Sequence, residues 1–287
     1  MKAFSQRRPF IYCLSVALVV VVLLDVACFG AVWLFPDLDS IALIAISSAA
    51  QLVLSISVIL LARNICVAKG WFKVNGTLNG LLMGWLPILY AVVMILVTAI
   101  NMPSEYWVVP KPWPLFVLVA VAFTTGLLEE VLVRGLVLNV LLNKSGITRK
   151  EILRACWISS ILFGLLHLSN FTTGAGVVET VGQIIYATFV GMLLAAIYLR
   201  TKSLWPPIIL HAVIDLPDTI FGAFVSSQTI EEIAQMQAAQ SIEEIIMSTL
   251  IKVALSTLGL IIAFILLRKP HVQTNRIFTF KGRSQLL

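Results

Sequence analysis

Eight long apolar stretches constrain this chain more than any other feature of its sequence. A transmembrane helix needs about 20 mostly apolar residues, within a range of about 17–25. Most of the remaining residues lie in short connections, so we expect one membrane domain over residues 1–287, an all-α bundle of about eight transmembrane helices. The expected spans are Pro9–Phe35, Ser40–Ala62, Gly80–Ile100, Trp113–Val140, Ile152–Leu168, Val177–Leu199, Leu204–Val225 and Ile245–Leu267.

The composition excludes several other classes of protein. Of the 287 residues, 60% are apolar and 12% are charged, and the mean hydropathy is +1.00. Soluble domains have about 45–50% apolar and about 25% charged residues, so an ordinary soluble protein, a disordered chain and a nucleic-acid-binding domain are excluded. Four cysteines without CxxC or paired spacing indicate neither a disulfide framework nor a cysteine metal site.

The charges in the connections indicate how the chain is oriented. Lys and Arg residues concentrate on the cytoplasmic side of membrane proteins. With the N-terminus inside, all but Lys111, Arg134 and Lys252 of the 20 Lys and Arg residues fall inside or at the inner edge. We therefore expect a multi-pass protein of the cell membrane with both termini in the cytoplasm, and we read the net charge of +6 as a sign of topology.

Two connections have patterns of their own. Thr229-x-x-Glu232 and Ser241-x-x-Glu244 have capping-box spacing, which predicts a short external helix and the start of the last spanning helix. The inner segment from Lys69 to Lys73 places Trp71 and Phe72 beside cations, as interfacial segments do. We expect both connections to serve as plain membrane anchors.

Ionisable residues are concentrated in three of the predicted spans. Such a residue costs about 2.5–3.5 kcal/mol at the centre of a spanning helix, so each is a functional candidate. Within each motif, residues spaced i,i+4 share one helix face. The three motifs are Glu129-Glu130-x-x-x-Arg134, Phe163-x-x-x-His167 and His211-x-x-x-Asp215.

These residues suggest a site that activates water. Glu130 and Arg134 can form an ion pair across one helical turn, which is more often structural than catalytic, and Glu129 points about 100° away from Glu130. A buried carboxylate, two imidazoles and a second carboxylate make a plausible centre for general acid–base chemistry. Two histidines and a carboxylate could equally hold zinc with one open position.

The three motifs, in this order and on separate helices, resemble those of the CPBP family, the CAAX-protease and bacteriocin-processing (Abi) intramembrane endopeptidases. The resemblance covers a core of about residues 114–225. It implies an eight-helix bundle around a membrane-buried site that is open to the cytosol, and a membrane protein or peptide as substrate. Prenylated CAAX tails belong to eukaryotic members, whereas bacterial members are linked to bacteriocin maturation, immunity or other peptide processing.

The resemblance also implies roles for the candidate site residues. Glu129 and His167 would activate water, and His211 and Asp215 would stabilise the oxyanion. Some members carry Asn where this chain has Asp215, and an ionised Asp only accepts hydrogen bonds. Asp215 must therefore be protonated or must orient His211. The complete set of candidates is Glu129, Glu130, Arg134, His167, His211 and Asp215.

We favour a mechanism without a cofactor. The chain lacks an HExxH pair, which would fix two metal ligands on one helical face. If zinc is bound, Glu129, His167 and His211 are the expected ligands. Two other functions compete with proteolysis: a transporter or proton-relay protein, which predicts inverted repeats that we do not find, and an immunity scaffold without catalysis.

The depth of the motifs in the membrane is a difficulty. At the helical rise, Glu129 lies about 22–24 Å from the outer start of its span and His167 about 22 Å from the inner start of its own. His211 lies only about 10 Å from the inner start of the seventh span. Tilted helices, a span that starts before Ile152, or a break near Pro206-Pro207 and Pro217 would bring them together.

Overall fold

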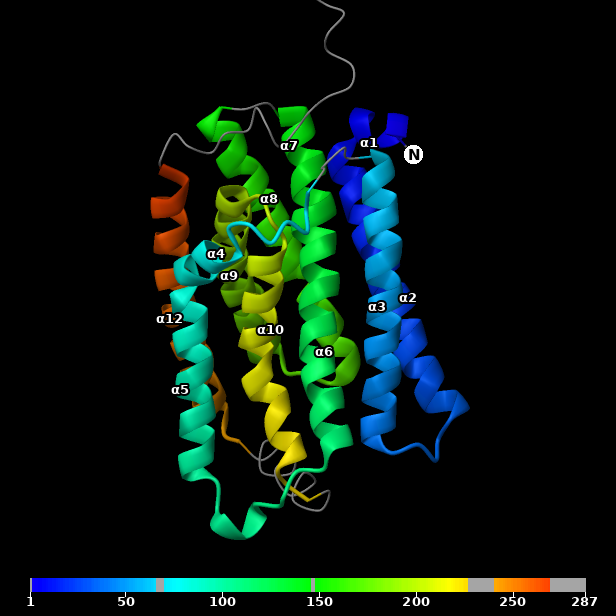
Figure 1. Cartoon of the computed structure of the whole chain (residues 1–287), viewed down its shortest axis with the longest axis vertical. Helices are drawn as coiled ribbons and strands as arrows, with labels where there is room; N and C mark the ends of the chain where they lie inside the picture. Colours follow the sequence, from blue (N-terminus) through cyan, green and yellow to red (C-terminus); the bar gives the residue numbers. More distant parts are fainter. Residues whose placement is uncertain (1, 66–69, 146–147, 227–239, 269–287) are drawn as a thin grey trace, which may run out of the picture.

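The chain folds into one bundle of helices that run mostly along its long axis (Figure 1). The computed structural model describes residues 2–65, 70–145, 148–226 and 240–268. These residues contain no strand, and their one isolated bridge joins Trp107 to Val225. The predicted all-α class is confirmed.

The elements follow one another with short connections. The helices are α1 (Lys2–Arg7), α2 (Pro9–Leu34), α3 (Ser40–Ile65), α4 (Thr77–Met83), α5 (Trp85–Asn101), α6 (Pro112–Glu130), α7 (Asn139–Ser145), α8 (Arg149–Leu166), α9 (Val177–Thr201), α10 (Trp205–Ile220) and α12 (Ile242–Arg268). A π-helix, η2 (Val131–Leu138), joins α6 to α7, and short 3-10 helices are η1 (Ser104–Tyr106), η3 (His167–Thr173) and η4 (Phe221–Ala223).

Each of the eight predicted spans coincides with a helix or a pair of helices, but not all are full-length crossings. Six helices in the described part of the chain are long and apolar enough to cross a membrane. The pair α4–α5 also qualifies by composition but bends by 66° at Gly84. Helix α10 has 16 residues, fewer than a straight span requires. The expected count of eight therefore becomes six long helices, one bent pair and one short helix.

Helix α10 starts below the upper end of the bundle in Figure 1 and ends at Ile220, where the 3-10 helix η4 follows. Lys202 ends α9 in a left-handed conformation, and two prolines in the first turn begin α10. The segment of residues 70–76, which we call the cap loop, crosses above this start. The main-chain oxygens of Trp71, Lys73 and Phe72 accept hydrogen bonds from Leu204 N at 2.6 Å, Ser203 Oγ at 2.7 Å and Trp205 Nε1 at 3.1 Å.

The cap loop corrects one prediction. Trp71 was expected at the membrane interface, but it is only 6% exposed and packs against the backbone of Gly135 and the side chain of Leu204. Burial in the bundle releases more of the indole surface from water than an interfacial position would. Trp71 is therefore part of the protein core at this end, whereas Lys73 and Val74 of the cap loop are exposed, and the anchoring role predicted for Trp71 is wrong.

Two capping boxes fix helix starts. Helix α8 begins at Arg149, before the expected Ile152, because Thr148 and Glu151 cap its first turn reciprocally. The predicted box of Ser241 and Glu244 is confirmed, with Ser241 N to Glu244 Oε2 at 2.8 Å. The other predicted box, Thr229-x-x-Glu232, lies outside the described residues.

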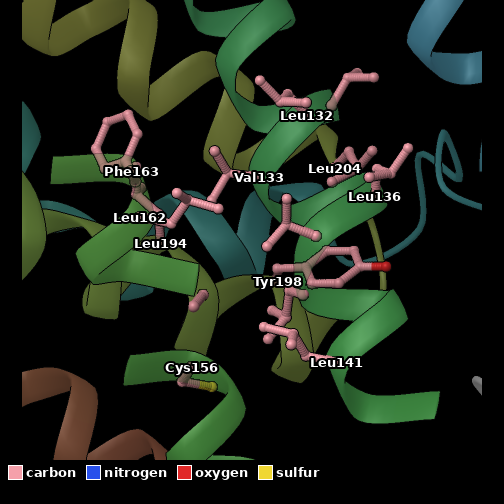
Figure 2. Close-up of a cluster of buried hydrophobic side chains, with 14 of the residues drawn as sticks. Leu132, Val133, Leu136, Leu141, Cys156, Leu162, Phe163, Leu194, Tyr198 and Leu204 are labelled. Atoms are coloured by element: carbon pink, nitrogen blue, oxygen red, sulfur yellow. The ribbon is translucent and has the colours of Figure 1, made fainter. Parts of the chain in front are cut away.

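The core is built around the π-helix η2, all eight residues of which are buried. Its side chains pack against α3, α8 and α9. Figure 2 shows Val133 of η2 near Leu162 of α8 and Leu194 of α9, and Leu136 of η2 near Leu204, all within one buried cluster. By contrast, many large apolar side chains of α2, α3 and α12 are exposed, as lipid-facing helices require. The most buried of the long helices therefore lie between residues 112 and 201, in the middle of the chain.

Candidate active site

A buried ion pair lies at the junction of α6 and η2. Arg134 Nη1 is 2.7 Å from Glu130 Oε1, and both side chains are fully buried. Arg134 Nη2 also donates a hydrogen bond to the main-chain oxygen of Gly191 at 2.9 Å, and its guanidinium lies 4.8 Å from the centre of the Phe163 ring. The predicted pairing of Glu130 with Arg134 is confirmed, and α8 and α9 both contribute to holding it.

His211 brings α10 into this pair. Its Nδ1 lies 2.8 Å from Glu130 Oε1, the oxygen that also contacts Arg134. A carboxylate oxygen paired with a guanidinium is an acceptor, so the Nδ1 of His211 carries the hydrogen and donates it. The Nε2 atom on the other side of the ring lies 3.2 Å from Glu129 Oε2 and 3.7 Å from Asp215 Oδ2. One imidazole thus connects all three carboxylates.

Gly126 allows this contact between α6 and α10. A Cβ at Gly126 would lie 3.0 Å from the main-chain nitrogen of Ala212 and 3.0 Å from the main-chain oxygen of Ile208. The hydrogen at this position therefore lets the two backbones approach closely, as small residues do in membrane helix pairs. The approach places His211 within hydrogen-bonding distance of the end of α6.

His167 joins the cluster through Phe163. Its Nδ1 lies 3.2 Å from the main-chain oxygen of Phe163, at the last turn of α8. The Phe163 ring meets the His167 ring edge to face at 5.2 Å and the His211 ring at 5.6 Å between centroids. Both predicted imidazoles therefore contact one phenyl ring, that of Phe163, which the sequence motif placed one helical turn from His167.

The cap loop and the early start of α8 explain the depth of the motifs. Counted at the helical rise, Glu129 lies about 24 Å from the end of α7 at Ser145, and His167 about 27 Å from the start of α8. His211 is only about 9 Å from the start of α10, but α10 itself starts below the cap loop. A deep start of α10 at its two prolines brings His211 to the level of Glu129, which is one of the solutions that the sequence left open.

The site has a closed and an open side. The side chains of Glu130 and Arg134 are fully buried and that of His211 is 8% exposed, whereas Glu129 and Asp215 are 29% and 30% exposed. Apart from their contacts with His211, Glu129 Oε2 and Asp215 Oδ2 have no hydrogen-bond donor in the described part of the chain. Two unsatisfied carboxylate oxygens beside an imidazole can bind and polarise a water molecule.

The candidate metal ligands are not arranged as a metal centre. No group of three or more His, Cys, Asp or Glu side chains among the described residues is placed to hold a metal ion. Glu129 and His211 are in contact, whereas His167 contacts Phe163. The arrangement is that of a hydrogen-bonded network of acids and bases.

Sequence patterns did not indicate two of the groups that shape the site. The Gly191 carbonyl binds Arg134 from α9, and the π-helix η2 starts directly after Glu130. A carbonyl leaves no signal in the residue type, although a glycine within a spanning helix points to close approach of a neighbour. A π-helix inside a longer helix cannot be recognised from the sequence pattern, although such segments are frequent at functional sites.

The comparisons with known proteins agree with the motifs. Residues 111–217 match the family model described as type II CAAX prenyl endopeptidase Rce1-like, which supports a protease kind of enzyme. No curated protein and no solved structure matches the chain. The matched segment contains all six candidate residues, from Glu129 on α6 to Asp215 on α10. This match over about a third of the chain agrees with the resemblance to the CPBP family of membrane proteases.

Proposed function

We propose that this protein is an intramembrane endopeptidase that hydrolyses a peptide bond of a membrane-associated protein or peptide. One observation carries the proposal: the His211 imidazole contacts Glu129 on one side and Glu130 on the other, inside the segment that matches the protease family. Ionisable side chains are costly inside a membrane, so a network of this kind indicates a site that binds water and transfers protons.

The proposed reaction begins with Glu129. This carboxylate takes a proton from a water molecule that His167 helps to hold, and the water oxygen attacks the carbonyl carbon of the substrate. The resulting oxyanion accepts a hydrogen bond from the His211 side of the site. The proton on Glu129 then passes to the leaving amine nitrogen as the C–N bond breaks.

Glu130, Arg134 and Asp215 support His211 in this proposal. Glu130 accepts the hydrogen of Nδ1 and is itself held by Arg134, so the Nε2 edge of the ring faces Glu129 and Asp215, the two partly exposed carboxylates. Asp215 lies one helical turn away, and its 3.7 Å distance from Nε2 suits an orienting charge more than a short hydrogen bond. Of the two roles open to Asp215, we favour orientation of His211.

The proposed reaction needs no metal ion. A zinc ion held by Glu129, His167 and His211 is the alternative, and it would require these side chains to move together from their present contacts. Metal analysis of the purified protein separates the two mechanisms. One equivalent of zinc, with activity lost on its removal and restored on its return, would contradict the metal-free reaction.

The substrate reaches the site from the bilayer or its cytoplasmic surface, and no nucleic acid takes part. We propose a location in the cell membrane with both termini in the cytoplasm. Helix α1 and the Arg268 end of α12 lie toward the same end of the bundle (Figure 1), and basic residues are concentrated at that end, as the positive-inside tendency requires. The family name does not select a prenylated tail over another peptide.

Cleavage of a membrane-peptide library by the purified protein tests the proposed function. Wild-type protein, Glu129→Ala and the control variant Glu105→Gln, at an exposed glutamate in η1, are incubated with the library in detergent or nanodiscs. We expect the same products from wild type and Glu105→Gln, and none from Glu129→Ala. Folded wild-type protein that cleaves nothing would contradict the proposal and would favour a transporter or an immunity scaffold.

A further inference from the structure

The π-helix next to the site ends in an unusual way. In a π-helix each carbonyl accepts from the N–H five residues later, which for Arg134 is the N–H of Asn139. That N–H donates instead to Leu136 O. The side chain of Asn139 replaces it: Nδ2 lies 3.0 Å from Arg134 O and 2.7 Å from Gly135 O. The return from η2 to α7 therefore depends on one carboxamide.

A second residue holds this carboxamide in place. The hydroxyl of Tyr198 accepts a hydrogen bond from Asn139 Nδ2 at 2.9 Å. Asn139 is completely buried and Tyr198 is 1% exposed, and Tyr198 lies within the core around η2 (Figure 2). A buried amide at this depth is costly unless its donors are used, so packing alone would favour leucine at this position.

Helix α9 therefore holds Arg134 at two points, the guanidinium and the main-chain carbonyl. Gly191 accepts from the guanidinium, and Tyr198, seven residues later, reaches the Arg134 carbonyl through Asn139. Seven residues are about two helical turns, so Gly191 and Tyr198 lie on one face of α9. The contacts then continue from Arg134 to Glu130 and from Glu130 to His211.

We propose that Asn139 and Tyr198 are positioning residues for the candidate active site, because their hydrogen bonds set the register of η2 and hence the place of Arg134 and Glu130 behind His211. The inference rests on the proposed function for its effect on catalysis. Its structural part, the dependence of η2 on the two side chains, stands independently of any activity.

Two variants test the inference in the full-length protein. Tyr198→Phe removes only the hydroxyl, and Asn139→Leu keeps the size of the side chain while removing its donors. The control is Ser256→Ala on α12, which also removes a hydrogen bond from a buried side chain, here to Val253 O at 2.8 Å, far from η2 in the chain. Hydrogen exchange of the segment Val131–Leu138 is measured by mass spectrometry in nanodiscs.

We expect faster exchange in Val131–Leu138 for both variants, larger for Asn139→Leu, and no change there for Ser256→Ala. Exchange in α2 and α12 should remain as in wild type, which separates a local effect from general destabilisation. Unchanged exchange of Val131–Leu138 in folded Asn139→Leu and Tyr198→Phe would overturn the inference, whatever the enzyme activity.

Kinetics on a peptide found in the library screen supplies the second readout. A positioning role predicts that kcat of Tyr198→Phe falls about tenfold with KM unchanged, a difference of about 1.4 kcal/mol in the barrier. The double variant should fall no further than Asn139→Leu alone, because both residues act through the same contacts. Wild-type kcat in folded Tyr198→Phe would overturn the role in catalysis, whereas an inactive wild-type protein would contradict the proposed function instead.

Discussion

The Nδ1 atom of His211 lies 2.8 Å from Oε1 of Glu130, although 81 residues separate the two in the chain. The same carboxylate oxygen is 2.7 Å from Arg134 Nη1, so Glu130 stands between a cation and an imidazole that belong to different helices. Because both Glu130 and Arg134 are fully buried, water cannot replace either partner. This relationship ties the stability of the α6–η2 junction to the orientation of His211.

Loss of either member of the buried pair should therefore reduce stability as well as activity. Removing one partner leaves an uncompensated buried charge, which typically costs about 3–5 kcal/mol. We expect Arg134→Ala and Glu130→Ala to lower the yield of monodisperse protein and its thermal midpoint, measured by fluorescence-detected size exclusion after heating. Arg149→Ala, at an exposed position of α8, is the control. A Glu130→Ala protein as stable as wild type but inactive would assign Glu130 to the chemistry instead.

Gly126→Ala should weaken the contact between α6 and α10. The new Cβ would lie 3.0 Å from main-chain atoms of α10, which cannot rotate away, so the helices must separate and His211 must withdraw from Glu129 and Glu130. Overpacking of this kind costs about 1–3 kcal/mol. We expect cleavage to fall with only a moderate loss of thermal stability. Gly30→Ala, where no atom lies within 4 Å of the added Cβ, should change neither, and equal behaviour of the two variants would contradict the close-approach argument.

Helix α3 is joined to α6 by a polar clamp close to Glu129. Gln51 Nε2 donates to Thr125 Oγ1 at 3.0 Å, and Gln51 Oε1 accepts from Thr124 Oγ1 at 2.6 Å. Hydrogen bonds between membrane helices contribute on average about 0.6 kcal/mol, with a maximum of about 1.7. We expect a coupling energy in this range from a double-mutant cycle of Gln51→Leu and Thr124→Val, measured by unfolding in mixed detergent. Strictly additive effects would show that the clamp does not join the helices.

The membrane topology can be measured with single cysteines. In a background without native cysteines, Lys73→Cys and Arg149→Cys should be protected from an impermeant thiol reagent in intact cells, whereas Asp39→Cys and Ser241→Cys should react. The reason is that basic residues, which stay in the cytoplasm, are concentrated on the side of the membrane where we expect Lys73 and Arg149. Permeabilised cells control for general reactivity. Labelling of Arg149→Cys in intact cells would contradict a cytoplasmic location of the start of α8.

The sequence predicted the helices and the site residues better than the way they meet. Hydropathy located every spanning segment, because a lipid environment demands about 20 apolar residues in each. The i,i+4 spacing of Glu130 and Arg134 was sufficient to predict their ion pair, since both lie on one helix. Contacts between helices were a different matter: nothing local in the sequence indicates that His211 meets both Glu129 and Glu130.

The predictions that were wrong also failed because they depend on contacts between distant parts of the chain. Trp71 was assigned to the membrane interface because aromatic residues beside cations are typical there, but its burial depends on Gly135 and Leu204, which are distant in the chain. The length of α10 was overestimated at its carboxyl end, because hydropathy does not distinguish the apolar 3-10 helix η4 and the bridge residue Val225 from further turns of α-helix. The π-helix η2 depends on the Asn139 side chain and its partner on α9, so no window of sequence reveals it.

The rate of peptide cleavage by metal-free Glu129→Gln protein tests the central claim most directly. Glutamine keeps the size of the side chain and its contact with His211 but cannot take a proton from water. We predict that wild-type protein, stripped of metal by a strong chelator and verified by metal analysis, cleaves its peptide at the untreated rate, and that equally stable Glu129→Gln protein shows no cleavage above background. Cleavage by Glu129→Gln at the wild-type rate would contradict the claim that Glu129 activates the water.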